Sequence, residues 1–232
     1  MKDTDFSSTH LDHQLSLLRE DVLKMWRLVI AQLEDSKAAL TTVNKDIAVE
    51  VIFSENSVNA LELLIDDRCE DIIALFTPVA SDLRFVLASL KINANLERIG
   101  DIAEGVAKFV ANMQPDFDSR LLEVSHIPEM FNQSVIITTL VMEAFEKKDT
   151  ELARRVFGKD KILDEINNQA AGIIATYLKD EHDSSKIMDA LYILSAIRKL
   201  ERVGDQAKNI AEELIFYAEA EVLKHRSKGR KK

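Results

Sequence analysis

The feature that most constrains this chain is a six-residue motif that occurs twice. Residues 96–101 read Leu-Glu-Arg-Ile-Gly-Asp, and residues 200–205 read Leu-Glu-Arg-Val-Gly-Asp, 104 positions later. Ile47-Ala48 aligns with Leu152-Ala153 at a spacing of 105, which a loop one residue shorter in the second half brings to 104. Self-similarity at a fixed period is typical of repeated structural units, so we expect two copies of one unit.

Each unit is predicted to consist of three long α-helices. The 232 residues include only six Gly and three Pro, too few for the many turns of a β-protein. Apolar residues recur every three or four positions, as at Leu18, Val22 and Met25, which is the period of a buried helix face. Pro78 is expected to end one helix and Pro128 to open another. The expected helices span residues 12–40, 46–75, 81–110, 128–148, 150–178 and 184–221.

The predicted fold class is therefore all-α, with two pseudo-symmetric three-helix bundles. Residues 112–119 are the stretch richest in helix breakers between long periodic segments, and we expect them to link the two halves. The first repeat then covers residues 1–111 and the second covers residues 120–223. Residues 224–232 form a basic tail, which we expect to be solvated.

Acidic residues are paired inside and near the repeated motif. A Glu and an Asp four positions apart lie on one face of a helix, although their like charges destabilise it slightly. The candidate metal ligands are Glu62 with Asp66, Glu97 with Asp101, Glu201 with Asp205, and more weakly Asp164. Asp164 does not align with the pair on the second helix of the first repeat, so the second site is less certain. The recurrence of these pairs predicts metal sites where helix faces converge.

Two structural alternatives stay open for the same residues. Gly100 and Gly204 each cost a helix about 1 kcal/mol relative to Ala, and each could simply allow a neighbouring helix to approach closely. Arg98, Arg202 or another basic residue could neutralise the acids. As metal ligands the acids would supply oxygen almost exclusively, because no histidine lies within the pairs. Such a set suits Mg, Ca or Mn, and iron in carboxylate clusters; zinc stays open as well.

Net charge, cysteine content and hydropathy indicate the binding partners and the cellular compartment that suit this chain. Its net charge of −10 argues against general nucleic-acid binding, because phosphate backbones are held mainly by Lys and Arg. Cys69 is the single cysteine and cannot form an internal disulfide. The N-terminal residues lack an apolar signal region, and no stretch reaches 18 uninterrupted apolar residues. We therefore expect a cytoplasmic protein.

The motifs and their order resemble those of the PhoU family of phosphate-uptake regulators. Residues 78–84 read Pro-Val-Ala-Ser-Asp-Leu-Arg and open the helix that carries the first repeated motif, and the second motif lies on the equivalent helix. In the second half, residues 184–188 replace that opening and lack its Asp and Arg, so any role of Asp82 and Arg84 belongs to one half.

The resemblance implies a non-catalytic regulator with metal ions on its acidic helix faces. It further implies a homodimer that links the ATPase subunit of a phosphate ABC transporter to a membrane sensor histidine kinase. Such a protein keeps the phosphate-starvation response off when phosphate is plentiful, and it reaches the membrane only through its partners.

Three other functions are weighed against this one. A metal-dependent phosphohydrolase could use clustered carboxylates, and His182-Asp183 superficially resembles part of such a site. A di-iron storage bundle would need Glu-x-x-His pairs that face the bundle interior. The cytoplasmic domain of a sodium-phosphate cotransporter carries similar helical modules, but a chain that begins at Met1 without a membrane span favours the free-standing form.

Overall fold

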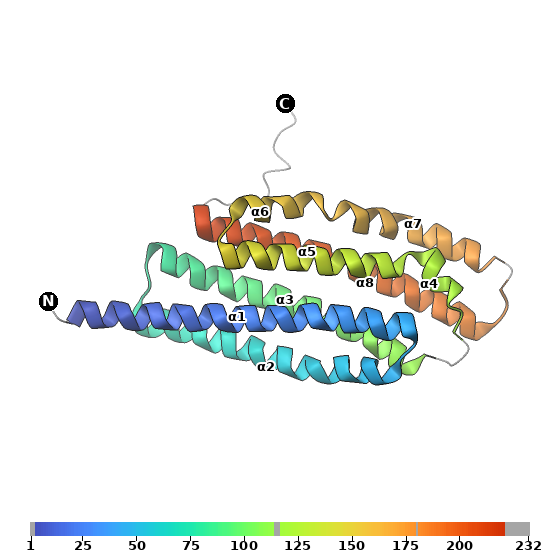
Figure 1. Cartoon of the computed structure of the whole chain (residues 1–232), viewed down its shortest axis with the longest axis horizontal. Coiled ribbons are helices and arrows are strands. Elements are labelled where there is room, and N and C mark those ends of the chain that lie inside the picture. The colour runs from blue at the N-terminus through green and yellow to red at the C-terminus, as the bar shows by residue number, and fades with distance from the viewer. Residues whose placement is uncertain (1–2, 114–116, 180, 221–232) are drawn as a thin grey trace, which may run out of the picture.

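The computed structural model of the chain is an elongated assembly of α-helices (Figure 1). It describes residues 3–113, 117–179 and 181–220, and no β-strand occurs within these ranges. None of the helices described there is long and apolar enough to cross a membrane. The elements are α1 (Asp3–Thr42), α2 (Lys45–Phe76), α3 (Ala80–Asn112), α4 (Arg120–Ser125), α5 (Ile127–Lys147), α6 (Thr150–Arg154), the 3-10 turn η1 (Arg155–Gly158), α7 (Lys161–Tyr177) and α8 (Ser184–Glu219).

The first repeat is the bundle of α1, α2 and α3, which pack against one another. The Asn44 side chain accepts hydrogen bonds from the backbone N–H groups of Asp46 and Ile47, so it caps the start of α2. Thr77 takes a left-handed conformation directly before Pro78, and α2 ends there as predicted. Its three helices match the expected ones, except that α1 extends further toward the N-terminus than residue 12.

The second repeat is built from α5, the segment α6–η1–α7, and α8. The expectation of one continuous helix over residues 150–178 is wrong, because the chain tightens into the 3-10 turn η1 that ends at Gly158. Glycine is a poor helix former, and the next helix starts only after Asp160. The short helix α4 was not predicted either. Pro128 lies in the first turn of α5, as expected.

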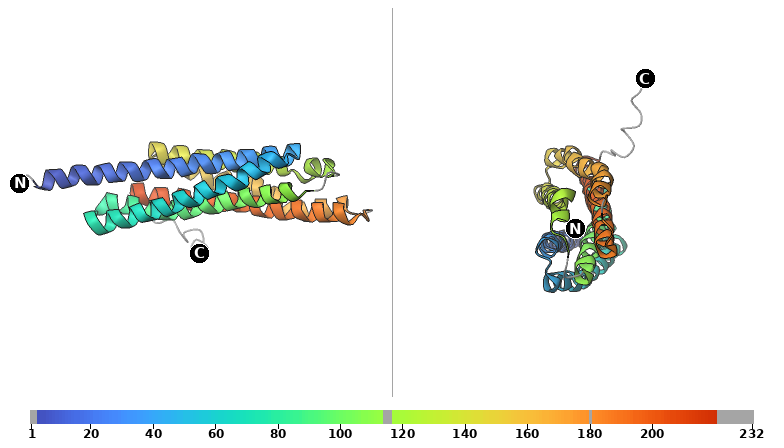
Figure 2. Two further views of the ribbon diagram at one scale, coloured as in Figure 1. Left: turned by 90° about the horizontal axis from the view of Figure 1, so that it is seen from below. Right: turned by 90° about the vertical axis from the view of Figure 1, so that its right-hand side faces the viewer.

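The two repeats lie side by side and are offset along the long axis, with α3 beside α8 and α1 beside α5 (Figures 1 and 2). The indole N–H of Trp26 on α1 donates a hydrogen bond of 3.1 Å to the backbone carbonyl of Thr138 on α5. The Trp26 ring also packs at 5.6 Å from the ring of Phe145, which in turn stacks on Phe85 of α3. A single continuous apolar core therefore joins the two bundles.

The ends of the expected domains are only partly described. Asn112 closes α3, close to the start of the predicted linker, and residues 114–116 of that linker lie outside the described residues. The last helix ends at Glu219, whereas residue 221 and the basic tail 224–232 lie outside them as well.

Candidate functional site

The acids predicted on α2 and α3 gather on one side of the first repeat. Glu62 and Asp66 of α2 and Glu97 of α3 are half-buried, while Asp101 is exposed. Asn93, a buried residue of α3, donates hydrogen bonds of 2.9 Å to the backbone carbonyl of Glu62 and 2.8 Å to Oδ1 of Asp66. These two bonds hold the acidic pair of α2 against α3, the helix that carries Glu97 and Asp101. We call these four acids, together with Glu55, the first acidic cluster.

Glu55 is the member of this cluster that the sequence did not reveal. It is only 4% exposed, and its Oε2 accepts a 2.9 Å hydrogen bond from Nε2 of Gln32. A Cβ atom on Gly100 would lie 3.1 Å from Oε2 of Glu55 and 3.1 Å from Oε1 of Gln32. The glycine of the first motif therefore lets α3 approach a buried polar pair, which confirms the close-packing alternative for this residue.

Burial and mutual repulsion raise the pKa values of the glutamates in the first cluster. Burial and the nearby carboxylates of Asp101, Glu62 and Glu55 raise the pKa of Glu97 to about 7. Burial followed by repulsion from Asp66 and Asp101 raises the pKa of Glu62. Burial also raises the pKa of Glu55, against the lowering effect of its hydrogen bond from Gln32. A cation bound here would relieve this repulsion.

The second repeat places its acids around a lysine. Asp160, just before α7, is 7% exposed, and its Oδ2 lies 2.6 Å from Nζ of Lys208. The same Nζ lies 2.9 Å from Oδ1 of Asp205. Glu201 is half-buried, and burial followed by the carboxylates of Asp205 and Asp164 raises its pKa, while Lys208 lowers it. The structure thus brings together all three predicted acids of this repeat, which with Asp160 form the second acidic cluster.

The second motif glycine is also a packing residue. A Cβ atom on Gly204 would lie 2.9 Å from Cδ1 of Leu163 and 3.4 Å from Cβ of Asp160. Neither Arg98 nor Arg202 forms an ion pair with any residue of the described chain, and both are exposed. Lys208 is instead the basic residue that neutralises acids in the second repeat. The alternative that a basic residue neutralises the acids therefore holds in the second repeat, but the residue is Lys208, which the sequence did not single out.

The two clusters differ in how well they fit a metal ion. Oε1 of Glu55 and Oδ1 of Asn93 are buried and have no hydrogen-bond partner among the described residues, so the first cluster offers oxygen atoms that lack a donor. No group of three or more His, Cys, Asp or Glu side chains in the described ranges is already arranged to hold a metal. A cation would have to draw the half-exposed carboxylates together by side-chain rotation. The oxygen donors of the first cluster fit a hard cation.

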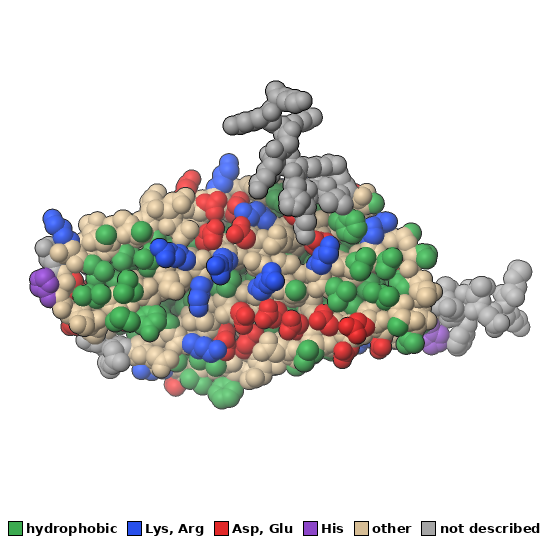
Figure 3. Space-filling view, turned by 180° about the vertical axis from the view of Figure 1, so that it is seen from behind, with side chains coloured by type: hydrophobic (Ala, Val, Ile, Leu, Met, Phe, Trp, Pro, Cys, Tyr) green, Lys and Arg blue, Asp and Glu red, His purple; other side chains and the backbone are tan. Residues whose placement is uncertain are grey.

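A row of basic side chains separates the two clusters. In Figure 3 this row runs lengthwise between a band of acidic side chains and a smaller acidic group on the other side. The row follows the groove between α3 and α8, which is lined by the basic residues Arg98, Lys108, Lys199 and Arg202. The clusters therefore lie on opposite flanks of this groove.

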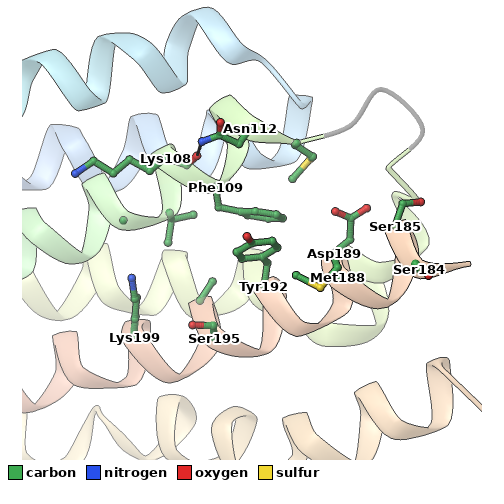
Figure 4. A pocket seen from close by; sticks show the side chains of 14 residues that line it. Lys108, Phe109, Asn112, Ser184, Ser185, Met188, Asp189, Tyr192, Ser195 and Lys199 are labelled. Atoms are coloured by element: carbon green, nitrogen blue, oxygen red, sulfur yellow. Dashed lines mark hydrogen bonds between the residues drawn. The ribbon is translucent and has the colours of Figure 1, made fainter.

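A pocket of about 860 Å³ continues the groove toward the start of α8 (Figure 4). Phe109 of α3 stacks on Tyr192 of α8 with ring centroids 4.8 Å apart. Tyr192 and Met188 are each 48% exposed, so the pocket presents apolar surface to solvent. Lys108 and Lys199 lie at the other side of the same pocket.

The residues behind the alternative functions have structural roles or lie at the surface. Asp183 caps α8 by accepting a hydrogen bond from the backbone of Ser185, and His182 beside it is exposed. The single Glu-x-x-His in the sequence joins Glu123 and His126, which are both exposed rather than turned into the bundle.

A comparison with known protein families identifies the family of this chain. The family model of the PhoU domain matches it twice, over residues 22–110 and 127–214. The chain belongs to the PhoU family. Each PhoU domain contains one copy of the repeated motif and one acidic cluster, and both motifs, on α3 and α8, fall within the matched residues.

PhoU proteins of similar length resemble this chain throughout. The phosphate-specific transport system accessory protein PhoU homolog 1 of Thermotoga maritima is 30% identical over 223 residues, which cover 95% of this chain and 94% of the relative. The PhoU homolog of Pseudomonas aeruginosa is 33% identical over 231 residues, 97% and 93% of the two chains.

Solved PhoU structures share the fold. The crystal structure of PhoU from Pseudomonas aeruginosa superposes with a TM-score of 0.80 at 32% identity and covers 90% of this chain and 99% of its own. The phosphate transport system regulatory protein PhoU from Streptococcus pneumoniae gives a TM-score of 0.82 at 26% identity, with coverages of 92% and 99%. The paired helical bundle is thus the PhoU fold.

Proposed function

We propose that this chain is a cytoplasmic, non-catalytic regulator that keeps phosphate uptake and the phosphate-starvation response low when phosphate is plentiful. Membership of the PhoU family over both repeats supports this role, since relatives that match almost end to end are named accessory or regulatory proteins of phosphate transport. Its partners in this proposal are the ATPase subunit of a phosphate ABC transporter and a sensor histidine kinase, and the chain acts as a homodimer.

The observation that carries the docking role is the exposed apolar pocket between α3 and α8. Exposed apolar surface that is rimmed by polar residues is typical of protein interaction sites. Tyr192 and Met188 supply that surface, and Lys108 and Lys199 supply a charged rim. We assign this pocket to the transporter ATPase subunit, because an aromatic anchor beside cationic side chains suits a partner segment with apolar and acidic residues.

Metal ions on the acidic faces are the second part of the proposal. The oxygen-only donors and the repulsion within the first acidic cluster favour a hard cation such as iron, magnesium or manganese, with zinc less well matched. Neutralising the cluster would remove the repulsion between carboxylates of α2 and α3, so in this proposal the metal has a structural or regulatory role rather than a catalytic one.

A reporter gene under a starvation-induced promoter tests the docking role. A strain that lacks the protein is complemented with the parent chain, which should restore repression in phosphate-rich medium. The variant Tyr192→Asp with Met188→Asp should lose repression and lose binding to the purified ATPase subunit. Phe53→Asp is the control, because Phe53 is 68% exposed on α2 and lies outside the pocket.

Two results would count against the proposal. Failure of the parent chain to restore repression would contradict the regulatory role itself. Full repression and binding by the pocket variant would contradict the pocket as docking site. Elemental analysis of protein purified without chelator tests the metal part separately.

A further inference from the structure

One pair of equivalent positions beside the two acidic clusters carries opposite charges. Glu104 on α3 and Lys208 on α8 are 104 positions apart, the same spacing that relates the two repeated motifs. Glu55 and Asp160 are 105 apart, the spacing already found for the second helices. Both repeats therefore have a buried acid beside the motif glycine, Glu55 in the first and Asp160 in the second. Only in the second repeat does a lysine, Lys208, contact that acid.

Lys208 is held in the second cluster like a bound cation. Its Nζ contacts Oδ2 of Asp160 at 2.6 Å and Oδ1 of Asp205 at 2.9 Å, from two different helices. Charge-assisted bonds of this length are among the stronger polar interactions of proteins. Burial acts to lower the pKa of Lys208, but the hydrogen bonds from its ammonium to Asp160 and Asp205 outweigh it and raise the pKa. The lysine therefore stays charged.

The first cluster has no such internal cation among the described residues. Glu104 pairs with Lys108 at 2.6 Å, but Lys108 points outward, with a side chain 56% exposed. Among the neighbours that shift the pKa of Glu55, Lys108 acts most weakly, and the other charged ones are acids. The buried Oε1 of Glu55 also lacks any hydrogen-bond donor within the described ranges.

The acids themselves are also distributed unequally. The positions equivalent to Glu62 and Asp66, 105 residues later, are Asn167 and Ala171. The second cluster therefore has fewer carboxylates and one ammonium, whereas the first has more carboxylates and none. Electrostatics therefore favours an added cation more strongly in the first repeat than in the second, where the ammonium of Lys208 already occupies the place between Asp160 and Asp205.

We propose that Lys208 is a built-in cation of the second repeat, so that a metal ion binds only at the first acidic cluster. This inference rests on the proposed metal binding. It makes the two repeats functionally unequal: the charge balance of the first acidic cluster depends on an external ion, while the second cluster carries its own positive charge.

Manganese(II) is a suitable probe, because the free aqueous ion gives a strong electron paramagnetic resonance signal that is lost on binding. The full chain, stripped with chelator and dialysed, is titrated with Mn²⁺ alone. The parent should bind at one repeat. Glu97→Gln with Asp101→Asn should weaken binding at least about tenfold, since affinity follows the number of charged ligands. Glu201→Gln with Asp205→Asn should leave it unchanged within about twofold, for the same reason.

A reciprocal exchange tests the lysine directly. Glu104→Lys puts an ammonium into the first cluster and should weaken its Mn²⁺ binding by about tenfold or more, because a fixed positive charge repels the ion. Lys208→Met removes the ammonium at nearly constant length and should add a second Mn²⁺ to the chain. Arg198→Met is the control on the same helix, because the exposed Arg198 contacts neither Asp160 nor Asp205 and lies outside the docking pocket, and it should leave Mn²⁺ binding unchanged. Circular dichroism checks that each variant is folded.

The possible outcomes separate the inference from the proposed function. Equal loss of Mn²⁺ from both carboxylate double variants would overturn the inequality of the repeats while supporting metal binding in general. A folded Lys208→Met chain that gains no Mn²⁺ would overturn the role of the lysine. If Lys208→Met does not fold, Glu104→Lys decides alone, and unchanged binding in that variant refutes the inference. Absence of Mn²⁺ from every chain refutes both this inference and the metal part of the proposal, whereas the reporter assay judges regulation independently.

Discussion

The raised pKa of Glu97 predicts that the metal-free protein loses stability as the pH rises toward neutrality. Its pKa is about 7 in the folded chain against 4.5 for an ordinary glutamate, because burial and then the charges of Asp101 and its neighbours disfavour ionisation. Between these values the folded state keeps a proton that the unfolded state has released. The free energy of unfolding therefore falls as the pH rises through this window, and the stabilisation present below pH 4.5 is lost above about 7.

The size of the effect follows from the change in pKa and from the exposure of the side chain. At about 1.4 kcal/mol for each pH unit, a rise from 4.5 to about 7 sets an upper limit of roughly 3 kcal/mol. Glu97 is only half-buried, and solvent screening reduces the expected effect to about 1 kcal/mol. In a chain of this length, about 1 kcal/mol corresponds to a change in Tm of roughly 2–4 °C.

Glu97→Gln removes the ionisable group and tests this reasoning. Urea unfolding is followed by circular dichroism with chelator present. The variant should nearly match the parent at about pH 5 and exceed its unfolding free energy by about 1 kcal/mol at about pH 8. Glu165→Gln, an exposed glutamate on α7, is the control and should show no such pH-dependent gap. A gap of the same size at both pH values, or a parent that is more stable at the higher pH, would refute the explanation.

Three further predictions concern packing. A Cβ atom added to Gly172 would meet no neighbouring group within 4 Å, so Gly172→Ala should stabilise the chain by about 0.5–1 kcal/mol through helix propensity. Gly100→Ala should be neutral or destabilising, because its methyl group would press on the buried pair of Gln32 and Glu55. Thermal unfolding of the two variants compares these effects. Trp26→Phe should lower the unfolding free energy by about 1–2 kcal/mol in denaturant titration, since it removes a buried hydrogen bond between the two repeats, from the indole N–H to the carbonyl of Thr138. Burial raises the pKa of the Cys69 thiol to about 12, and the residue is fully buried, so iodoacetamide should label it only in denaturant; labelling of the native chain at the same rate would contradict this burial.

The candidate site was predictable only in part. Glu97 and Asp101 lie on one helix, and their spacing alone places them on one face. Glu55 is a single acid within a long helix, with nothing local to distinguish it from a solvated one. Its importance comes from contact with Gln32 on α1 and Gly100 on α3, and those three positions meet only after packing.

The sequence by itself determined the helical class, the duplication and the acidic pairs, because each depends on residues close together in the chain or on a repeated pattern. The break at η1 and the pairing of α3 with α8 were decided by the tertiary structure. So was the contact of Lys208 with Asp160, which lies 48 positions away along the chain. The strength and sign of a charge interaction depend on distance and burial, and these quantities exist only once separate helices have packed together.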